Sequence, residues 1–262
     1  MRSSATKGGR AVHVPDPAHF DRHAARYGQA RPPYPPELWE TLRSRGLLRP
    51  GHRALDLGAG TGQATGPLLA DGLEVTAVEP GPHLASRLAT EHPMATVIVR
   101  RAEDLEGNDA SFELAVAATS IHWMDIETLL PLLHRLLVPT GRLLVWRNVY
   151  GDPSVRTPFR DRVAKIVRER SAPTRCGPDP EDPVATASRL TGTGLFSVEH
   201  TATFRWDIEL SSEQVHDLFS TFSDWSPAEV DRAADAAQDL GGRVVEHYSS
   251  WLIILAPTRR AR

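Results

Sequence analysis

Short apolar runs alternate with segments of helical periodicity between residues 53 and 150. The runs predict strands over 54–57, 73–78, 96–99, 112–118 and 142–146. The helical spacing predicts helices over 63–70, 82–91 and 126–137, with Pro139-Thr140-Gly141 as the turn into the fifth strand. Short connections force successive strands to run parallel, because each helix must cross back over the sheet. This region is therefore predicted to be a doubly wound α/β sheet.

The flanking segments differ in character. Before the sheet, we expect a helix over 19–31, a stiff proline connector (31–36) and a helix over 37–45. After it, we expect a helix over 155–170, a long loop over 171–183, strands over 196–206 and 243–255, and helices from Ser212 and from Pro227. The two late strands would complete a mostly parallel, seven-stranded sheet, and the helices between them would cap its ligand edge.

The chain is accordingly divided into four parts. They are a disordered head (1–18), an α/β core with N-terminal helices that binds the cofactor (19–150), a helical cap with the penultimate strand (151–240), and the last strand and tail (241–262). The cap contains Phe219, Phe222 and Trp225, which could line a substrate pocket or bind the cap to the sheet. Packing is the simpler interpretation of these three rings.

Composition and charge exclude several classes of protein. A net charge of −3 over 262 residues provides no field for a polyanion, so no nucleic-acid partner is expected. Cys176 is the single cysteine, and His19 and His23 have no third ligand nearby, so we expect neither a disulfide framework nor a metal site. Neither a signal peptide nor a run of about 18 apolar residues is visible, which predicts a cytoplasmic protein without a membrane partner.

The most informative stretch is Asp56-Leu57-Gly58-Ala59-Gly60-Thr61-Gly62-Gln63, where the first strand turns into a helix. Glycines there adopt positive φ and let the backbone approach a ligand closely. The second strand ends in Glu79, 21 residues after Gly58, where an acid can accept both hydroxyls of a ribose. Together these features indicate an adenosine-containing cofactor rather than a tight turn alone.

The glycine spacing separates two classes of cofactor. Dinucleotide sites use G-x-G-x-x-G, whereas this loop places glycine at 58, 60 and 62. The carboxylate of Asp56 suits an ammonium and a sulfonium better than phosphates. A nucleotide-cofactor (NAD-type) oxidoreductase and a non-catalytic cofactor-binding protein remain the alternatives.

Three further motifs accompany the loop: Val75-Thr76-Ala77-Val78-Glu79-Pro80, Ala102-Glu103-Asp104-Leu105 and Ala118-Thr119-Ser120-Ile121-His122-Trp123. With them the sequence resembles the class I S-adenosylmethionine-dependent methyltransferases, in the small-molecule group that carries His-Trp after the fourth strand. Tyr27 with Arg31-Pro32-Pro33-Tyr34-Pro35 is similar to the N-terminal segment of that group. The resemblance covers about residues 20–149 and implies a Rossmann-like methyltransferase fold.

The resemblance also implies S-adenosyl-L-methionine as the cofactor and a set of residues around it. Gly58, Ala59 and Gly60 would line its amino-acid half, with Asp56 beneath the ammonium. Glu79 would hold the ribose, and Pro80 would shape the same rim. Ala102 and Glu103 would meet the adenine, and Thr119 would lie near the methyl-bearing end. Tyr27 and Arg31 complete the implied set.

Five residues are candidates for the substrate side. His122 would act as a base or a substrate hydrogen-bond partner, or else be a packed histidine. Trp123 would form a pocket wall, and Tyr34 would close over the cofactor or belong to ordinary packing. Arg147 and Asn148 would contact substrate, the arginine as a clamp for an anionic group, or else form a solvated strand end.

These expectations combine into one function. We expect a methyltransferase that acts on a small organic molecule such as a secondary metabolite. Oxygen is preferred over nitrogen or carbon as the acceptor atom, because His122 offers a proton acceptor and no acidic cluster suggests amine binding. The oligomeric state is not readable from the chain.

Overall fold

The computed structural model describes residues 21, 28, 30–170 and 179–259. The predicted disordered head lies outside these residues, as does Tyr27. Of the helix predicted over 19–31, Asp21, Gly28 and Ala30 are described and are helical, whereas Arg31 already lies outside the helix. The first eight residues of the predicted loop over 171–183 also lie outside the described part of the chain.

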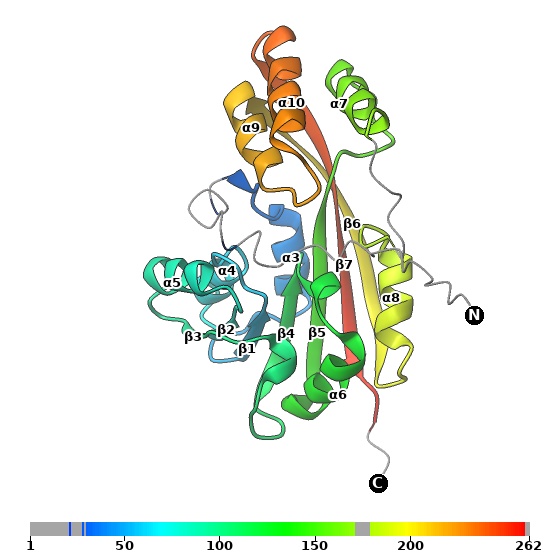
Figure 1. The fold of residues 1–262 in the computed structure, drawn as a ribbon. Helices are drawn as coiled ribbons and strands as arrows, with labels where there is room; N and C mark the ends of the chain where they lie inside the picture. The colour runs from blue at the N-terminus through cyan, green and yellow to red at the C-terminus, as the bar shows by residue number, and fades with distance from the viewer. Residues whose placement is uncertain (1–20, 22–27, 29, 171–178, 260–262) are drawn as a thin grey trace, which may run out of the picture.

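Seven strands form one sheet in the order β3-β2-β1-β4-β5-β7-β6 (Figure 1). Their bounds are β1 (Arg53–Leu57), β2 (Glu74–Val78), β3 (Thr96–Ile98), β4 (Phe112–Ala118), β5 (Leu137–Tyr150), β6 (Phe196–Ser211) and β7 (Arg243–Pro257). The strands β1 to β5 pair in parallel, and β7 runs antiparallel between β5 and β6. The predicted mostly parallel, seven-stranded α/β sheet is therefore confirmed.

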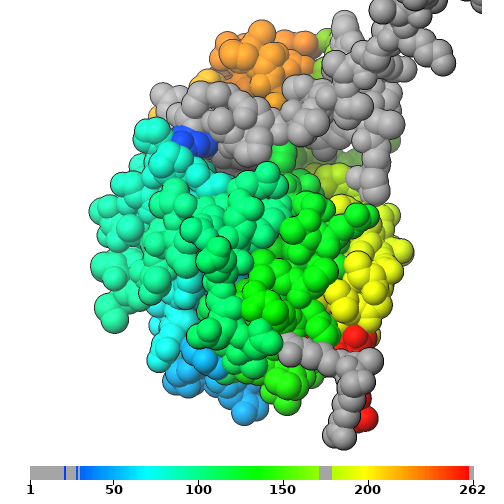
Figure 2. Space-filling view, turned by 60° about the horizontal axis from the view of Figure 1, so that its bottom comes forward, coloured from blue at the N-terminus to red at the C-terminus, as the bar shows by residue number. Residues whose placement is uncertain are grey.

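The helices pack on both faces of this sheet. Their bounds are α3 (Pro36–Ser44), α4 (Thr65–Ala70), α5 (Pro82–Glu91), α6 (Ile126–Leu136), α7 (Pro158–Arg168), α8 (Pro183–Thr191), α9 (Ser212–Ser220) and α10 (Pro227–Asp239). Leu133 of α6 and Leu190 of α8 belong to the apolar core of one face, and Leu38 of α3 and Leu68 of α4 to that of the other. Figure 2 shows α6 and α8 (green and yellow) side by side.

The sequence-based bounds fail mainly on the strands that complete the sheet. The turn predicted at 139–141 lies within β5, where Phe112 pairs with Leu137 and Leu114 already pairs with Arg142. The segment thus bulges out of the ladder instead of preceding the strand. The last two strands are also longer than predicted, because β6 and β7 pair with each other along almost their whole length. The helix α8 was not predicted.

Three helices form a separate layer where β5, β6 and β7 extend past the shorter strands (Figure 1). We term α7, α9 and α10 the three-helix layer. Its apolar contacts include Phe159 of α7, Phe219 of α9 and Val230 of α10, which are all buried in one cluster. Phe222 and Trp225 pack against the same cluster, so these rings bind the layer together. The helix α8 packs on the sheet instead, although it comes from the same stretch of sequence.

None of the helices in the described residues combines the length and apolar character needed to cross a membrane.

Candidate cofactor site

The glycine loop follows β1 and is tied to the end of β2. Gly58, Gly60 and Gly62 have φ values of 63°, 59° and 95°, in the left-handed region that glycine adopts without steric cost. The amides of Gly58 and Ala59 both donate to the carbonyl of Val78, at 2.8 and 3.1 Å. A Cβ on Gly58 would lie 2.8 Å from the Cβ of Ser120. The loop therefore requires glycine at position 58 for its backbone conformation and for its close contact with Ser120.

Asp56 lies in β1, two residues before Gly58, and its carboxylate is fully buried. Its Oδ2 accepts a hydrogen bond of 2.6 Å from the hydroxyl of Thr65, whereas its Oδ1 has no hydrogen-bond partner among the described residues. Burial raises the pKa of Asp56 to about 6, a rise that Glu79 adds to and the Thr65 hydrogen bond opposes. A buried carboxylate oxygen that lacks a donor fits an ammonium group well.

Glu79 lies at the carboxyl end of the neighbouring strand and is 6% exposed. Its oxygens accept from the amides of Gly60 (2.9 Å) and Gly81 (2.8 Å). Burial raises the pKa of Glu79 in spite of these two hydrogen bonds. The backbone thus holds the carboxylate in place, and each oxygen retains a lone pair for a further donor such as a ribose hydroxyl. Pro80, the next residue, is exposed at the same rim.

Ala102 and Glu103 belong to a short 3₁₀ helix (Ala102–Asp104) after β3. Ala102 is buried. The carboxylate of Glu103 accepts from the amide of Asp125 at 2.7 Å and from Arg101 at 3.1 Å. Burial opposes ionisation of Glu103, yet these hydrogen bonds outweigh it and lower its pKa. Arg101 therefore fixes the ionised side chain of its neighbour.

Thr119 ends β4 in an unusual conformation. Its φ is 59°, which costs a β-branched residue about 1–2 kcal/mol. Its amide donates to the carbonyl of Trp146 at 2.8 Å, and its hydroxyl lies 3.1 Å from that of Tyr34. The ring of Tyr34 is buried and packs edge-on against Trp146. Tyr34 therefore belongs to the core and reaches the site through its hydroxyl.

Two further residues of the predicted site, Arg31 and Asn148, contact other segments of the chain. The guanidinium of Arg31 lies 4.7 Å from the ring centre of Phe222 and donates to the carbonyl of Thr221 at 3.1 Å, so it points toward the three-helix layer. The amide of Asn148 donates to the carbonyl of Pro33 at 3.2 Å and accepts from Ser250 at 2.7 Å. Asn148 thus ties the proline connector to the sheet.

His122, Trp123 and Arg147 meet at the end of β4 and β5. The rings of His122 and Trp123 are 4.8 Å apart, centre to centre. Nη1 of Arg147 lies 3.1 Å from Nδ1 of His122, and its Nη2 lies 3.7 Å from a carboxylate oxygen of Glu181. Arg147 therefore links the loop after β4 to the segment that leads into α8.

Sequence reasoning missed Asp21. Its carboxylate accepts from the amides of His83 (2.8 Å) and Leu84 (3.1 Å) at the start of α5. A Cβ on Gly81 would lie 2.7 Å from the same carboxylate and 3.0 Å from Glu79. Asp21 thus lies next to the predicted ribose acid. No local pattern could reveal this, because the contact joins residues about 60 positions apart.

Comparison with known proteins agrees with this geometry. A family described as "Methyltransferase domain" matches residues 55–145. An uncharacterized methyltransferase of Mycobacterium bovis is 38% identical over 130 residues, which is 49% of this chain and 52% of that protein. An uncharacterized methyltransferase-like protein of Schizosaccharomyces pombe is 28% identical over 208 residues, covering 78% of this chain and 77% of the relative. The chain thus spans about half the length of the bacterial relative.

Solved structures show the same fold. A candidate type II methyltransferase from Anaeromyxobacter dehalogenans superposes with a TM-score of 0.62 at 24% identity, over 86% of this chain and 97% of that one. A phosphoethanolamine N-methyltransferase from Haemonchus contortus, solved with S-adenosylhomocysteine, gives 0.55 at 15% identity, over 91% of this chain and 58% of that one. Residues 55–145 thus match a methyltransferase domain, and the chain shares the fold of solved methyltransferases.

Proposed function

We propose that this chain transfers the methyl group of S-adenosylmethionine to a small organic molecule, such as a secondary metabolite. The observation that carries the proposal is the buried carboxylate of Asp56, whose Oδ1 lacks a donor among the described residues, next to a glycine loop with positive φ. Glu79 lies at the end of the adjacent strand with both oxygens oriented by backbone amides. This combination suits a ligand with an ammonium and a ribose.

The residues at the strand ends would each contact a different part of the cofactor. Asp56 would pair with the ammonium, Glu79 would accept the ribose hydroxyls beside Pro80, and Ala102 and Glu103 would meet the adenine. The backbone of Gly58, Ala59 and Gly60 would line the amino-acid half, with Thr119 near the reactive end. Tyr27 stays in this set as a prediction. The bound cofactor supplies an electrophilic methyl group, and the chain aligns the acceptor with it and excludes water.

The acceptor would enter beside His122, Trp123 and Arg147. The ring of Trp123 offers an apolar wall, and Arg147 is the cationic group of this part of the site. The three-helix layer would act as the helical cap over the ligand edge. We prefer oxygen as the acceptor atom, because an imidazole at this position can serve as a proton acceptor once the guanidinium of Arg147, now 3.1 Å from Nδ1 of His122, has moved off the ring.

Calorimetric titration with S-adenosylhomocysteine and with NAD tests the cofactor assignment. We expect saturable binding of S-adenosylhomocysteine alone, and at least tenfold weaker binding in Glu79→Gln, which weakens the acceptor of the ribose hydroxyls. Glu74→Gln is the matched control, since Glu74 is exposed at the opposite end of the same strand. Saturable binding of NAD without S-adenosylhomocysteine would identify a nucleotide-cofactor oxidoreductase and refute the proposal.

A transfer assay separates the enzyme from a cofactor-binding protein. The chain is incubated with methyl-labelled S-adenosylmethionine and a small-molecule extract, and products are detected by mass spectrometry. We expect labelled products that disappear in Glu79→Gln. Tight cofactor binding with no labelled product from any extract would favour a non-catalytic role.

A further inference from the structure

A second group of buried polar side chains lies where β5 and β7 extend toward the three-helix layer. Tyr150 and Tyr248 face each other across these strands, with ring centres 5.5 Å apart. Glu246 lies two residues before Tyr248 and therefore on the same face of the sheet. Arg160 of α7 reaches both: its Cζ lies 4.7 Å from the ring centre of Tyr150, and its Nη1 lies 3.7 Å from Glu246. We term these four residues the β5–β7 polar cluster.

Five polar atoms of this cluster have no partner within normal hydrogen-bond distance among the described residues. They are the hydroxyls of Tyr150 and Tyr248, Nη1 of Arg160 and both carboxylate oxygens of Glu246. Glu246 is 0% exposed and Tyr248 is 3% exposed. More than about 90% of buried polar groups in proteins are hydrogen-bonded, because an unpaired one is costly. Arg160 and Tyr150 reach Glu246 only at longer range, so these atoms satisfy one another in part, and a ligand group placed among them would complete their hydrogen bonds.

The backbone is built to admit Arg160 to this cluster. Gly151, directly after β5, has a φ of 77°, and a Cβ there would lie 2.1 Å from Cζ of Arg160. A side chain at position 151 would therefore displace the guanidinium. The left-handed glycine and the half-buried arginine together indicate a specific arrangement rather than loose packing.

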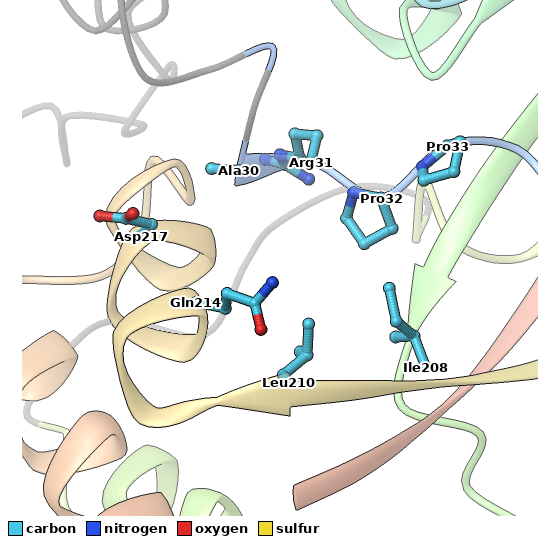
Figure 3. Close-up of a pocket in the computed structure, with 8 residues that line it drawn as sticks. All are labelled: Ala30, Arg31, Pro32, Pro33, Ile208, Leu210, Gln214 and Asp217. Atoms are coloured by element: carbon cyan, nitrogen blue, oxygen red, sulfur yellow. The ribbon is translucent and has the colours of Figure 1, made fainter. Parts of the chain in front are cut away.

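A pocket of about 150 Å³ lies on the same face of the sheet as the cluster, one strand away. Ile208, which lines it, pairs in register with Glu246. Figure 3 shows the proline connector facing β6 and α9 across this space, with Pro32, Ile208 and Leu210 as apolar walls. Trp206, two residues before Ile208, stacks on Tyr248 with ring centres 4.6 Å apart. A cavity of this size accommodates a ligand comparable to a single benzene ring.

The charges around the pocket and cluster balance. Arg160 offsets Glu246, and the pocket lining contains one cation, Arg31, and one anion, Asp217. A further ion of either sign beside the buried Glu246 and Tyr248 would add a charge with no counter-charge left to pair with, which is costly. The unpartnered atoms include both acceptors and donors, and a hydroxyl group both donates and accepts. The chemistry therefore favours a neutral, hydroxyl-bearing ligand.

We propose that the pocket and the β5–β7 polar cluster bind the neutral, hydroxyl-bearing end of the acceptor molecule, remote from the atom that is methylated. This inference rests on the proposed methyl transfer. Tyr150 lies four residues along β5 from Trp146, whose carbonyl binds Thr119, so the cluster is about 13 Å along the strand from the predicted methyl-transfer end. The acceptor is then an elongated molecule with a ring-sized, hydroxylated end.

Matched aromatic probes test the chemistry directly: 2-phenylethanol, ethylbenzene, 2-phenylethylamine and phenylacetate. Binding is measured by protein NMR titration with and without saturating S-adenosylhomocysteine. Burial raises the pKa of Glu246 to about 7 against the lowering effects of Arg160 and Tyr150, so titrations are run at pH 8, where this carboxylate is ionised. We expect the alcohol to bind about tenfold tighter than each of the other three probes.

Two variants assign the binding to the cluster. Tyr248→Phe removes one buried hydroxyl and should weaken binding of the alcohol about fivefold while leaving ethylbenzene unchanged. Glu246→Gln should do the same, and Glu209→Gln, at an exposed residue of β6 paired with Arg243, should change neither probe. If Glu246→Gln does not fold by circular dichroism, Tyr248→Phe decides the question.

Equal affinity for alcohol and ethylbenzene would overturn the proposal, because the cluster would then hold only water. Preference for the amine or the carboxylate would overturn it too, as would unchanged alcohol binding in Tyr248→Phe. The S-adenosylhomocysteine titration on the same samples tests the proposed methyl transfer separately from the proposed pocket. Alcohol binding without cofactor binding refutes the proposed methyl transfer and keeps the pocket, whereas the reverse refutes the pocket alone.

Discussion

The burial of Asp56 should couple cofactor binding to proton release. Its pKa of about 6 compares with an ordinary value of 3.8, and the difference corresponds to about 3 kcal/mol against ionisation in the folded, ligand-free protein. An ammonium next to Oδ1 stabilises the ionised carboxylate and so reverses this effect. Binding of S-adenosylhomocysteine therefore requires that Asp56 lose its proton wherever it is still protonated.

The sign and size of the pH dependence follow. Above pH 7 Asp56 is already ionised in the free protein, so the dissociation constant should be nearly constant. Below pH 6 protons compete with the ligand, and affinity should fall up to tenfold per pH unit. Because the folded pKa is raised, Asp56 also destabilises the ligand-free protein as pH rises from about 4 to 6.

The variant Asp56→Asn separates binding from folding. It should bind S-adenosylhomocysteine at least tenfold more weakly at pH 7.5. Its affinity should also no longer fall below pH 6 through protonation of Asp56. Its free energy of unfolding without ligand at pH 7.5 should equal or exceed that of the parent, because a neutral amide replaces a carboxylate whose charge is destabilised by burial. A structural defect would lower both the affinity and the free energy of unfolding. Only weaker binding together with unchanged or higher stability supports the role of Asp56.

Isothermal titration calorimetry from pH 5 to 8, in two buffers of different ionisation enthalpy, measures affinity and proton release together. Asp109→Asn is the control, since Asp109 is an exposed residue ahead of β4. Burial also raises the pKa of Glu79, so Glu79→Gln is titrated in parallel to isolate its contribution. A pH-independent affinity in the parent protein, or the same pH profile in Asp56→Asn, would refute the argument.

Three further outcomes are expected. Gly58→Ala should destabilise the fold by at least about 1 kcal/mol through its positive φ and abolish cofactor binding in calorimetry, because its Cβ meets Ser120 at 2.8 Å; near-normal affinity would contradict this. His122→Ala should lower turnover less than about tenfold if the ring mainly positions its neighbours, whereas a loss of about 10²-fold or more would establish a general base. Arg53 lowers the pKa of Glu113 to about 2, so Glu113→Gln should cost about 1–2 kcal/mol at pH 7 in urea unfolding, after allowance for solvent screening. That difference should vanish as pH falls from 4.5 toward 2, since a depressed folded pKa stabilises only above the unfolded value.

Local elements with strong boundary residues were predictable. The helix predicted over 82–91 has those bounds in the structure, because Gly81 and Pro82 start it and its apolar residues recur on one face. The glycine loop was predictable too, since the strand, the positive-φ positions and the helix lie within about ten residues. Errors concentrated in β5, β6 and β7, whose extent depends on pairing between residues up to about 100 positions apart.

The candidate site divides in the same way. Asp56, the glycines and Glu79 carry their roles in their spacing along the chain. The placement of Arg31 against Phe222, of Asn148 under the proline connector and of Asp21 beside Glu79 follows from contacts between distant segments. No residue pattern around any one of these positions contains that information.

By itself, therefore, the sequence determined the order of the strands and of the helices other than α8, the loop that approaches the cofactor and the acids at the strand ends. These depend on φ preferences and hydrophobic spacing over a few residues. Only the tertiary structure decided which buried charges lack a close hydrogen-bond partner. Burial and hydrogen-bond satisfaction are set by whichever strands and helices converge. This singles out Oδ1 of Asp56 and the carboxylate of Glu246, which Arg160 approaches only to 3.7 Å.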